Sequence, residues 1–284
     1  MKVQRISVIG AGTMGNGIAG QAAICGHDVI LNDVDEERID AGIANIERTW
    51  AKGVTRGKVA PEAVEDARSR LGRSTSIEEA VAHADLVIEA VPENMELKKT
   101  LFARFEAAAP NHALFGSNTS SLSITEIASA VERPERVIGM HFFNPVAVMK
   151  LLELVRGEFT SDETVATVLA LSEALGKEAI VVNDAPGFAT SRLGIALGNE
   201  AMRMFEEGVA SAADIDKAMV LGYRHPIGPL ALTDLVGLDV RLAISEHLHR
   251  EIGTDTFRPP RILRRMVRAG KLGRKSGRGF YDYD

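Results

Sequence analysis

The sequence predicts a doubly wound, mostly parallel α/β sheet followed by an all-helical C-terminal domain. Three observations support this fold class. Short apolar segments alternate with helical patterns over the first two hundred residues, a glycine-rich turn follows the first apolar segment, and a turn cluster at residues 183–187 precedes a helical region. Strands that alternate with helices indicate βαβ units and a parallel sheet. We therefore expect an α/β domain at residues 1–185 and a helical domain at residues 186–284.

The predicted elements follow one another in a regular order. Short apolar runs predict strands at residues 6–9, 28–31, 86–89, 114–117, 137–141, 151–155 and 179–182. Helical patterns between them lie at residues 15–25, 36–52, 61–70, 94–108, 124–131 and 162–175. The C-terminal helices are predicted at residues 188–207, 213–221, 229–234, 238–251 and 262–269, with a last candidate strand at 279–283. Glycines stand where helix C-caps are expected, at Gly208, Gly222, Gly237, Gly253 and Gly270.

Composition narrows the class of protein. The chain has 284 residues, of which 45% are hydrophobic and 25% charged, so it can build a sizeable core. Its net charge of −6 argues against a nucleic-acid binder, and no apolar run reaches the roughly 18 residues of a membrane span. The single Cys25 fits a reducing compartment, and the N-terminus enters a strand without an apolar signal region. We expect a cytoplasmic protein.

The glycine-rich turn has the form of a dinucleotide-binding fingerprint. It follows the first strand, opens a helix, and consists of Gly10, Ala11, Gly12, Thr13, Met14 and Gly15. Its glycines suit a tight turn, close approach to a pyrophosphate and close helix–strand packing, and the helix N-terminus then holds the phosphates. Asp33 follows about twenty residues on, where a carboxylate binds the ribose 2′-hydroxyl and disfavours NADP. The sequence predicts that this turn binds NAD. The alternatives are an FAD site or a glycine-rich turn that binds no nucleotide.

Polar residues end several strands of the predicted sheet. Glu89, Glu93, Ser120 and His141 all follow or end a strand, at the edge where ligands bind in doubly wound folds. The turn signal Asn144-Pro145 and an apolar run that contains Glu153 come after His141. If the chain doubles back there, the buried carboxylate pairs with the imidazole, and a histidine oriented in this way is a general base. The alternative is a structural histidine and a rim glutamate that never meet.

Several motifs together resemble the 3-hydroxyacyl-CoA dehydrogenase family, and within it the bacterial 3-hydroxybutyryl-CoA dehydrogenases. The motifs are the glycine turn, the Glu-Ala-Val-Pro-Glu segment that ends at Glu93, the Ser-Asn-Thr-Ser-Ser segment at 117–121, the His-Phe-Phe-Asn-Pro segment that begins at His141, and Lys-Leu-Leu-Glu ending at Glu153. The similarity continues to the C-terminus and covers essentially the whole chain. It implies a Rossmann-type fold and NAD-dependent oxidation of a (3S)-3-hydroxyacyl-CoA, such as 3-hydroxybutyryl-CoA, or the reverse reduction of acetoacetyl-CoA. A β-oxidation step and a reductive biosynthetic step would need the same residues.

The resemblance also implies roles for individual residues. His141 is the general base and Glu153 orients its ring. Ser120 contacts the reacting oxygen and lies near the cofactor, and Asn144 lies near the nicotinamide. Contacts to the cofactor are implied for Glu93, Lys98 and Lys275, and contacts to the phosphates of coenzyme A for Lys52 and Arg56. No metal site is expected.

One position departs from the family pattern. Ser191 stands where the family usually has an asparagine that helps to bind the substrate oxygen, and its hydroxyl binds that oxygen directly or through a water. The resemblance further implies a homodimer through the helical domain and a substrate cleft between the domains. Two alternatives stay open: a related dehydrogenase of a free hydroxy or sugar acid, like the lambda-crystallin relatives, and a non-catalytic NAD-binding structural protein.

Overall fold

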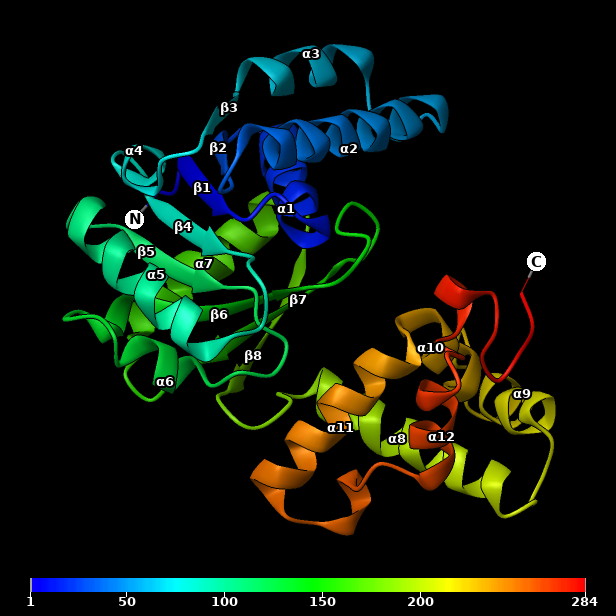
Figure 1. The fold of residues 1–284 in the computed structure, drawn as a ribbon. Helices are drawn as coiled ribbons and strands as arrows, with labels where there is room; N and C mark the ends of the chain where they lie inside the picture. Colours follow the sequence, from blue (N-terminus) through cyan, green and yellow to red (C-terminus); the bar gives the residue numbers. More distant parts are fainter. Residues whose placement is uncertain (1, 284) are drawn as a thin grey trace. The chain divides into compact units, whose positions relative to one another are not determined.

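A computed structural model describes residues 2–283 of the chain. The chain forms two compact units, Met1–Asp184 and Ala185–Asp284. The first unit holds an eight-stranded sheet and the second is helical (Figure 1). The predicted fold class is confirmed. Among residues 2–283, the helices include none that is both long and apolar enough to cross a bilayer.

The sheet of the first unit has the strand order β3-β2-β1-β4-β5-β6-β7-β8. Its strands are β1 (Arg5–Ile9), β2 (Asp28–Asn32), β3 (Leu71–Ser74), β4 (Leu86–Glu89), β5 (Leu114–Ser117), β6 (Val137–Phe142), β7 (Leu151–Arg156) and β8 (Glu178–Asn183). Neighbouring strands run parallel except β6 and β7, which are antiparallel. The order changes direction at β1 and β4, so the ends of these two strands form the switch point where such sheets bind ligands.

Helices cover both faces of this sheet. They are α1 (Thr13–Ile24), α2 (Glu36–Thr55), α3 (Pro61–Ser69), α4 (Ile77–Val81), α5 (Met95–Ala108), α6 (Ile124–Ala128) and α7 (Asp162–Ala174). α1 and α7 lie on one face, where Gln21 Nε2 donates to the carbonyl of Leu175 over 3.0 Å. α5 and α6 lie on the other face (Figure 1). Both faces of the central strands are buried, which explains why their sequences are mostly apolar without alternation.

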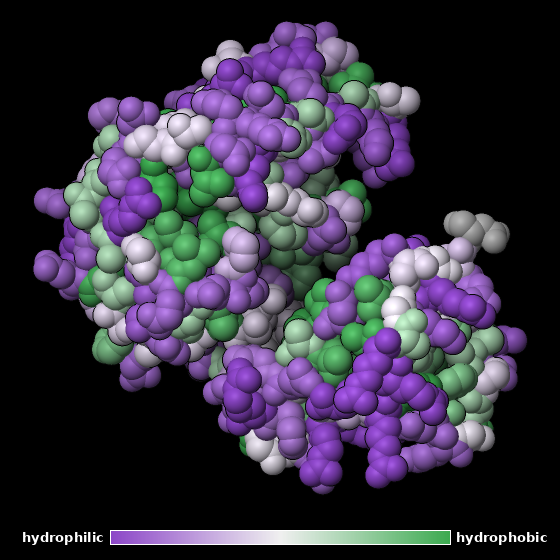
Figure 2. All heavy atoms as spheres, in the orientation of Figure 1, coloured by the Kyte–Doolittle hydropathy of each residue, from purple (hydrophilic) through white to green (hydrophobic). Residues whose placement is uncertain are grey.

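Local sequence explains where the helices begin. The side chains of Asp35, Asn94, Ser123 and Ser161 each accept a hydrogen bond from a backbone N–H in the first turn of the helix that follows. Ser123 and Glu126 occupy the positions of a capping box. The outer surfaces of α2 and α3 are mostly hydrophilic (Figure 2), as expected for helices with one solvent-facing side.

The second unit packs five α-helices around its own core. They are α8 (Thr190–Glu206), α9 (Ala212–Tyr223), α10 (Pro229–Val236), α11 (Leu238–Ile252) and α12 (Arg261–Arg268). The core includes Met202, Leu230, Leu238 and Leu263. Three short 3-10 turns complete the described elements: η1 (Pro134–Arg136) in the first unit, and η2 (Asp255–Phe257) and η3 (Arg274–Ser276) in the second.

Two buried carboxylates fasten the C-terminal tail to this helical core. Asp234 accepts hydrogen bonds from the backbone N–H groups of Phe280 and Tyr281 and from the hydroxyl of Tyr283, over 2.9 to 3.0 Å. Asp216 accepts from the hydroxyl of Tyr281 over 2.7 Å and also from two N–H groups at the start of α10. The tail is therefore held by charged hydrogen bonds rather than by a strand.

The structure corrects four local expectations. The predicted strand at 279–283 is wrong, because this segment forms only isolated bridges. β3 and α4 were not predicted, since β3 has a single apolar residue and α4 has only five residues. Gly222 is not a C-cap, because it lies inside α9; the C-cap is Arg224, which adopts φ 57°.

Candidate active site

The glycine turn is built for close backbone approach. Gly10 has φ 105°, a conformation that favours glycine, and a Cβ there would lie 2.7 Å from the carbonyl oxygen of Ala90. A Cβ on Gly15 would lie 1.7 Å from the carbonyl oxygen of Gly10, so the helix can follow the turn this closely only with glycine. A Cβ on Gly12 would have no heavy atom within 4 Å, so this side of the turn is open. The turn fits a pyrophosphate at the N-terminus of α1.

The turn residues and Asp33 are positioned as one group. Ala11 is buried, Thr13 and Met14 form the first residues of α1, and Asp33 directly follows β2. Asp33 Oδ2 accepts from the backbone N–H of Ala11 over 2.7 Å, and its other oxygen accepts from Val34 N–H. These bonds hold the carboxylate beside the turn, where the ribose of a dinucleotide is expected.

His141 and Glu153 face each other across the antiparallel strands β6 and β7. The two residues are partners in the strand register, and His141 Nδ1 lies 2.9 Å from Glu153 Oε2. The Glu153 side chain is fully buried, and His141 is 7% exposed. A carboxylate in this position holds the proton on Nδ1, so Nε2 is left as the nitrogen that can accept a proton. The arrangement is that of an oriented general base.

The segment after β5 connects this pair to the rest of the sheet edge. Asn118 N–H donates to the carbonyl of Glu89 over 2.8 Å, and Asn118 Oδ1 accepts from the N–H of Phe142 over 2.9 Å. Asn118 thus supports the end of β6 directly beside His141. The sequence places Asn118 in a polar cluster but predicts no role for it. Its position between Ser117 and Thr119 at the end of a strand was the sequence feature that could have indicated one.

Ser120 is held by Glu93. Its backbone N–H donates to Glu93 Oε1 over 2.8 Å, its hydroxyl lies 3.3 Å from the same oxygen, and Thr119 Oγ1 donates to it over 2.8 Å. Glu93 precedes α5 rather than lying in its first turn. The carboxylate therefore fixes the conformation of the loop that carries Ser120.

A buried ion pair lies under this loop. Lys98 Nζ is 2.6 Å from Glu89 Oε1 and 3.2 Å from Glu93 Oε2, and Lys98 and Glu89 are 1% and 0% exposed. Glu89 also accepts from Ser117 Oγ over 2.6 Å and from Val91 N–H over 2.7 Å. Lys98 is thus committed to two carboxylates in this structure, and its predicted contact to the cofactor ribose stays a prediction.

The loop between β6 and β7 carries Asn144, which is exposed and precedes a cis peptide bond to Pro145. Lys177 supports this loop, because its buried ammonium donates hydrogen bonds to the carbonyls of Val146 and Met149, the latter over 2.9 Å. Burial lowers the pKa of Lys177. A buried cation that is satisfied by loop carbonyls fixes the backbone next to Asn144.

The remaining predicted residues lie elsewhere in the two units. Lys52 is in the last turn of α2 and Arg56 is its C-cap residue, and both are exposed. Ser191 lies in the first turn of α8. Lys275 is in the helical unit too, where its ammonium is 2.6 Å from Asp239. Their predicted contacts to coenzyme A, substrate and cofactor stay predictions.

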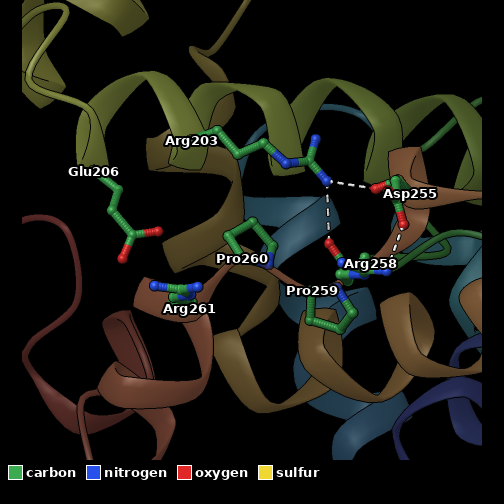
Figure 3. Close-up of a pocket in the computed structure, with 7 residues that line it drawn as sticks. All are labelled: Arg203, Glu206, Asp255, Arg258, Pro259, Pro260 and Arg261. Carbon is green, nitrogen blue, oxygen red and sulfur yellow. Dashed lines mark hydrogen bonds and ion pairs between the residues drawn. The ribbon is translucent and has the colours of Figure 1, made fainter.

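One surface pocket belongs to the helical unit alone. It has a volume of about 450 Å³ and is lined by residues of α8, η2 and the start of α12 (Figure 3). Arg203 donates to the carbonyls of Asp255 and Arg258 there, and Arg258 pairs with Asp255 over 2.8 Å. These bonds tie the elements together, and none of the predicted site residues lines the pocket. Within residues 2–283 no three His, Cys, Asp or Glu side chains are arranged to hold a metal ion.

Comparison with known proteins identifies the family. Residues 5–185 match the NAD binding domain of 3-hydroxyacyl-CoA dehydrogenase, and residues 187–283 match the C-terminal domain of the same family. The chain is 49% identical to a probable 3-hydroxybutyryl-CoA dehydrogenase of Bacillus subtilis, covering 100% of this chain and 99% of that one. It is 45% identical to 3-hydroxybutyryl-CoA dehydrogenase of Clostridioides difficile, covering 99% of both chains.

A solved structure agrees with these matches. The crystal structure of (S)-3-hydroxybutyryl-CoA dehydrogenase from Ralstonia eutropha superposes with a TM-score of 0.95 at 43% identity, covering 100% of both chains. The similarity therefore covers both units of the chain. The chain belongs to the 3-hydroxyacyl-CoA dehydrogenase family.

Proposed function

We propose that the protein is an NAD-dependent (3S)-3-hydroxyacyl-CoA dehydrogenase for short acyl chains such as 3-hydroxybutyryl-CoA. It would oxidise the 3-hydroxyl to a ketone or reduce acetoacetyl-CoA in reverse. The observation that carries the proposal is the 2.9 Å pair of His141 and Glu153 at the same sheet edge as the glycine turn. Relatives with names of this activity match over their full length, which supports the short-chain substrate.

In the proposed mechanism His141 moves the proton. Nε2 takes the proton of the substrate's 3-hydroxyl, and Glu153 keeps Nδ1–H in place and stabilises the imidazolium that forms. In the reductive direction the imidazolium returns the proton to the new hydroxyl. Ser120, fixed through Glu93, donates to the reacting oxygen, and Asn144 orients the groups around it. Bound NAD supplies the acceptor for the hydride that leaves C3.

The cofactor site consists of residues that fit NAD. Gly10, Gly12 and Gly15 leave the space that a pyrophosphate needs, and Asp33 offers a carboxylate to the ribose. The same carboxylate would repel a 2′-phosphate, which favours NAD over NADP. Glu93, Lys98 and Lys275 complete the proposed cofactor contacts.

The proposed substrate contacts come from residues of both units. Ser191 would bind the substrate oxygen in place of the family's usual asparagine. Lys52 and Arg56 are exposed cations of a kind that binds the phosphates of coenzyme A. An acidic protein needs such a local basic site to hold a polyanionic substrate.

We further propose a homodimer through the helical unit, which would also line the substrate cleft. Large apolar side chains are exposed there, among them Leu193 at 71%, Leu221 at 70% and Tyr223 at 75%. Hydrophobic side chains also gather around α10 and α11 (Figure 2). Exposed apolar area of this kind is typical of an association surface. A cytoplasmic location and a place in fatty-acid metabolism, either in β-oxidation or in its reductive counterpart, belong to the same proposal.

An NADH oxidation assay tests the proposal. Acetoacetyl-CoA should be reduced, and free acetoacetate should not. The His141→Gln variant should lose about 10²- to 10⁴-fold in kcat, the usual contribution of general acid–base catalysis. The matched control is His112→Gln, which changes a half-exposed histidine of the same unit that pairs with Asp85. No turnover of the thioester would refute the function, turnover of the free acid would favour the hydroxy-acid relatives, and a His141→Gln enzyme within twofold of wild type would show another base.

A further inference from the structure

Lys177 is a buried cation whose described partners are loop carbonyls. It lies in the turn between α7 and β8 and is 6% exposed. Its ammonium donates to the carbonyls of Val146 and Met149 in the loop between β6 and β7, and among residues 2–283 it pairs with no acidic side chain. Burying an ammonium is costly, and an apolar side chain could fill the same space. The feature that this cation secures is the position of the loop.

The same loop fits into a notch on α1. A Cβ on Gly17 would lie 2.9 Å from Cγ2 and 3.1 Å from Cβ of Val146, which is itself 3% exposed. Glycine inside a helix is less favourable than alanine by about 1 kcal/mol, so its presence at this position has a packing reason. The loop can lie this close to α1 because position 17 carries no side chain.

A third contact completes the arrangement. Gln21 follows Gly17 by one turn on the same face of α1, and its Nε2 donates to the carbonyl of Leu175 over 3.0 Å. Leu175 is the C-cap residue of α7, two positions before Lys177. The helix, the loop and the turn are therefore joined in pairs, through Gly17 and Val146, through the Lys177 ammonium, and through Gln21. None of the three segments can shift alone without breaking a contact.

The joined segments serve different parts of the candidate site. Gly17 comes two residues after Gly15, the last glycine of the turn that fits a pyrophosphate. The loop carries Asn144 and connects the strands of His141 and Glu153. One packing contact thus links the pyrophosphate end of the proposed cofactor site to its nicotinamide end. Catalysis is sensitive to such alignment, because a misplacement of about 1 Å can lower the rate about 100-fold.

We propose that Lys177 and Gly17 are positioning residues for the dehydrogenase reaction. Together they lock the loop that carries Asn144 to the helix that receives the dinucleotide, so that the asparagine keeps a fixed place beside the nicotinamide. Both residues act through the loop and not by contact with substrate or cofactor. The proposal rests on the dehydrogenase function proposed above.

Steady-state kinetics with acetoacetyl-CoA test the role of the ammonium. Lys177→Met should lower kcat, expressed per bound NADH, by about 10- to 100-fold. The dissociation constant of NADH should stay within about threefold, because the glycine turn is untouched. Lys177→Gln, which keeps two N–H donors on a shorter chain, should fall between wild type and Lys177→Met. The matched control is Lys150→Met at the end of the same loop; its exposed pair with Glu178 is 3.4 Å long, so kcat should stay within about twofold.

A double variant separates positioning from a general loss of stability. Asn144→Ala should itself lower kcat. If Lys177 acts through Asn144, adding Lys177→Met to Asn144→Ala should lower kcat further by less than about threefold, whereas independent effects would multiply. A variant that merely folds less well would lose activity equally in both backgrounds.

Hydrogen exchange gives a readout that needs neither cofactor nor turnover. The N–H groups of Val148 and Met149 both donate to the carbonyl of Pro145, over 2.9 and 3.0 Å. In the ligand-free protein these two amides should exchange faster in Lys177→Met than in wild type or in Lys150→Met. If wild type does not reduce acetoacetyl-CoA, the dehydrogenase function fails, and the exchange rates still decide whether Lys177 holds the loop.

Gly17→Ala perturbs the loop from the helix side. The added methyl group presses on Val146, so kcat should fall while NADH still binds. Gly222→Ala is the control, because its methyl group points into open space on the helix α9. If Lys177→Met does not fold, Lys177→Gln and Gly17→Ala decide the question. A kcat within twofold of wild type in these variants, effects that multiply with Asn144→Ala, or unchanged exchange at residues 148 and 149 would each overturn the proposal.

Discussion

The buried pair of Lys98 and Glu89 supports a quantitative prediction for the sheet edge. Lys98→Met removes the ammonium and leaves a fully buried carboxylate without its cation. Breaking a buried ion pair in this way costs about 3 to 5 kcal/mol. Glu89 keeps its bonds from Ser117 and Val91, so we expect the lower end, about 3 kcal/mol. For a unit of this size that lowers the melting midpoint by about 6 to 12 °C.

The neighbouring lysine is a matched control. Lys99 lies on the same helix, is 31% exposed and is 3.9 Å from Glu96, so Lys99→Met should cost less than about 0.5 kcal/mol. The double variant Glu89→Gln, Lys98→Met removes both charges and should recover at least about 1.5 kcal/mol, since the isolated carboxylate is then gone. Urea unfolding followed by circular dichroism measures all four proteins.

The outcome also decides what Lys98 does for the cofactor. If Lys98→Met and wild type unfold at the same urea concentration, the buried Glu89 carboxylate does not destabilise the variant, and the predicted loss of about 3 kcal/mol is wrong. NADH affinity, measured by fluorescence titration in the folded variants, separates the two roles. A loss in the double variant as large as in Lys98→Met would support a direct ribose contact, and recovery in the double variant would support a positioning role through Glu89.

Two further predictions concern pH and the tail. Burial would raise the pKa of Asp85, but hydrogen bonds from the backbone N–H groups of Arg5 and Gln4 outweigh this effect, so the pKa of Asp85 is lowered in the folded state. The carboxylate therefore stabilises the fold at pH values above its unfolded pKa of about 4. This stabilisation is lost as the pH falls through the lowered pKa of the folded state. Asp85→Asn should therefore flatten the acid side of urea midpoints measured from pH 7 to pH 2; an unchanged slope would contradict this. Burial and its bond to Asp234 raise the pKa of Tyr283, so its contribution is complete below about pH 10 and is lost as pH rises through the raised value. Asp234→Asn should cost about 1.5 to 3 kcal/mol and speed hydrogen exchange at residues 280–283, whereas slow exchange there would show that packing alone holds the tail.

Sequence patterns predicted the strands that have a continuous apolar run and missed β3, which has none. The buried strands β4 and β5 have the predicted bounds, because both of their faces must be apolar. The edge strand β3 contains Gly72 and Arg73 and has no buried residue, so its sequence carries no strand period. The C-cap of α9 is Arg224, which adopts a left-handed conformation, and no local sequence signal marks that residue.

The candidate site was likewise predicted only in part. Chemistry-bearing residues could be placed at the sheet edge because strand ends are predictable and parallel strands share an edge. The ion pair of Glu89 and Lys98 under the Ser120 loop could not be predicted. The two residues are nine positions apart, on a strand and a helix, and their contact depends on how α5 packs on the sheet.

The reversal of one strand explains why the pair at the centre of the site is so well defined. A parallel β7 would need a long crossover and would bring residues far from His141 in sequence to its side. The antiparallel β7 follows after eight residues, and its register places Glu153 directly opposite His141. Because side chains alternate between faces, a slip of one residue would turn the carboxylate to the other face of the sheet. The Lys177 clamp on the connecting loop and the Asn118 bond to Phe142 both oppose such a slip. The geometry of the His141–Glu153 pair is therefore fixed by the backbone pairing of β6 and β7.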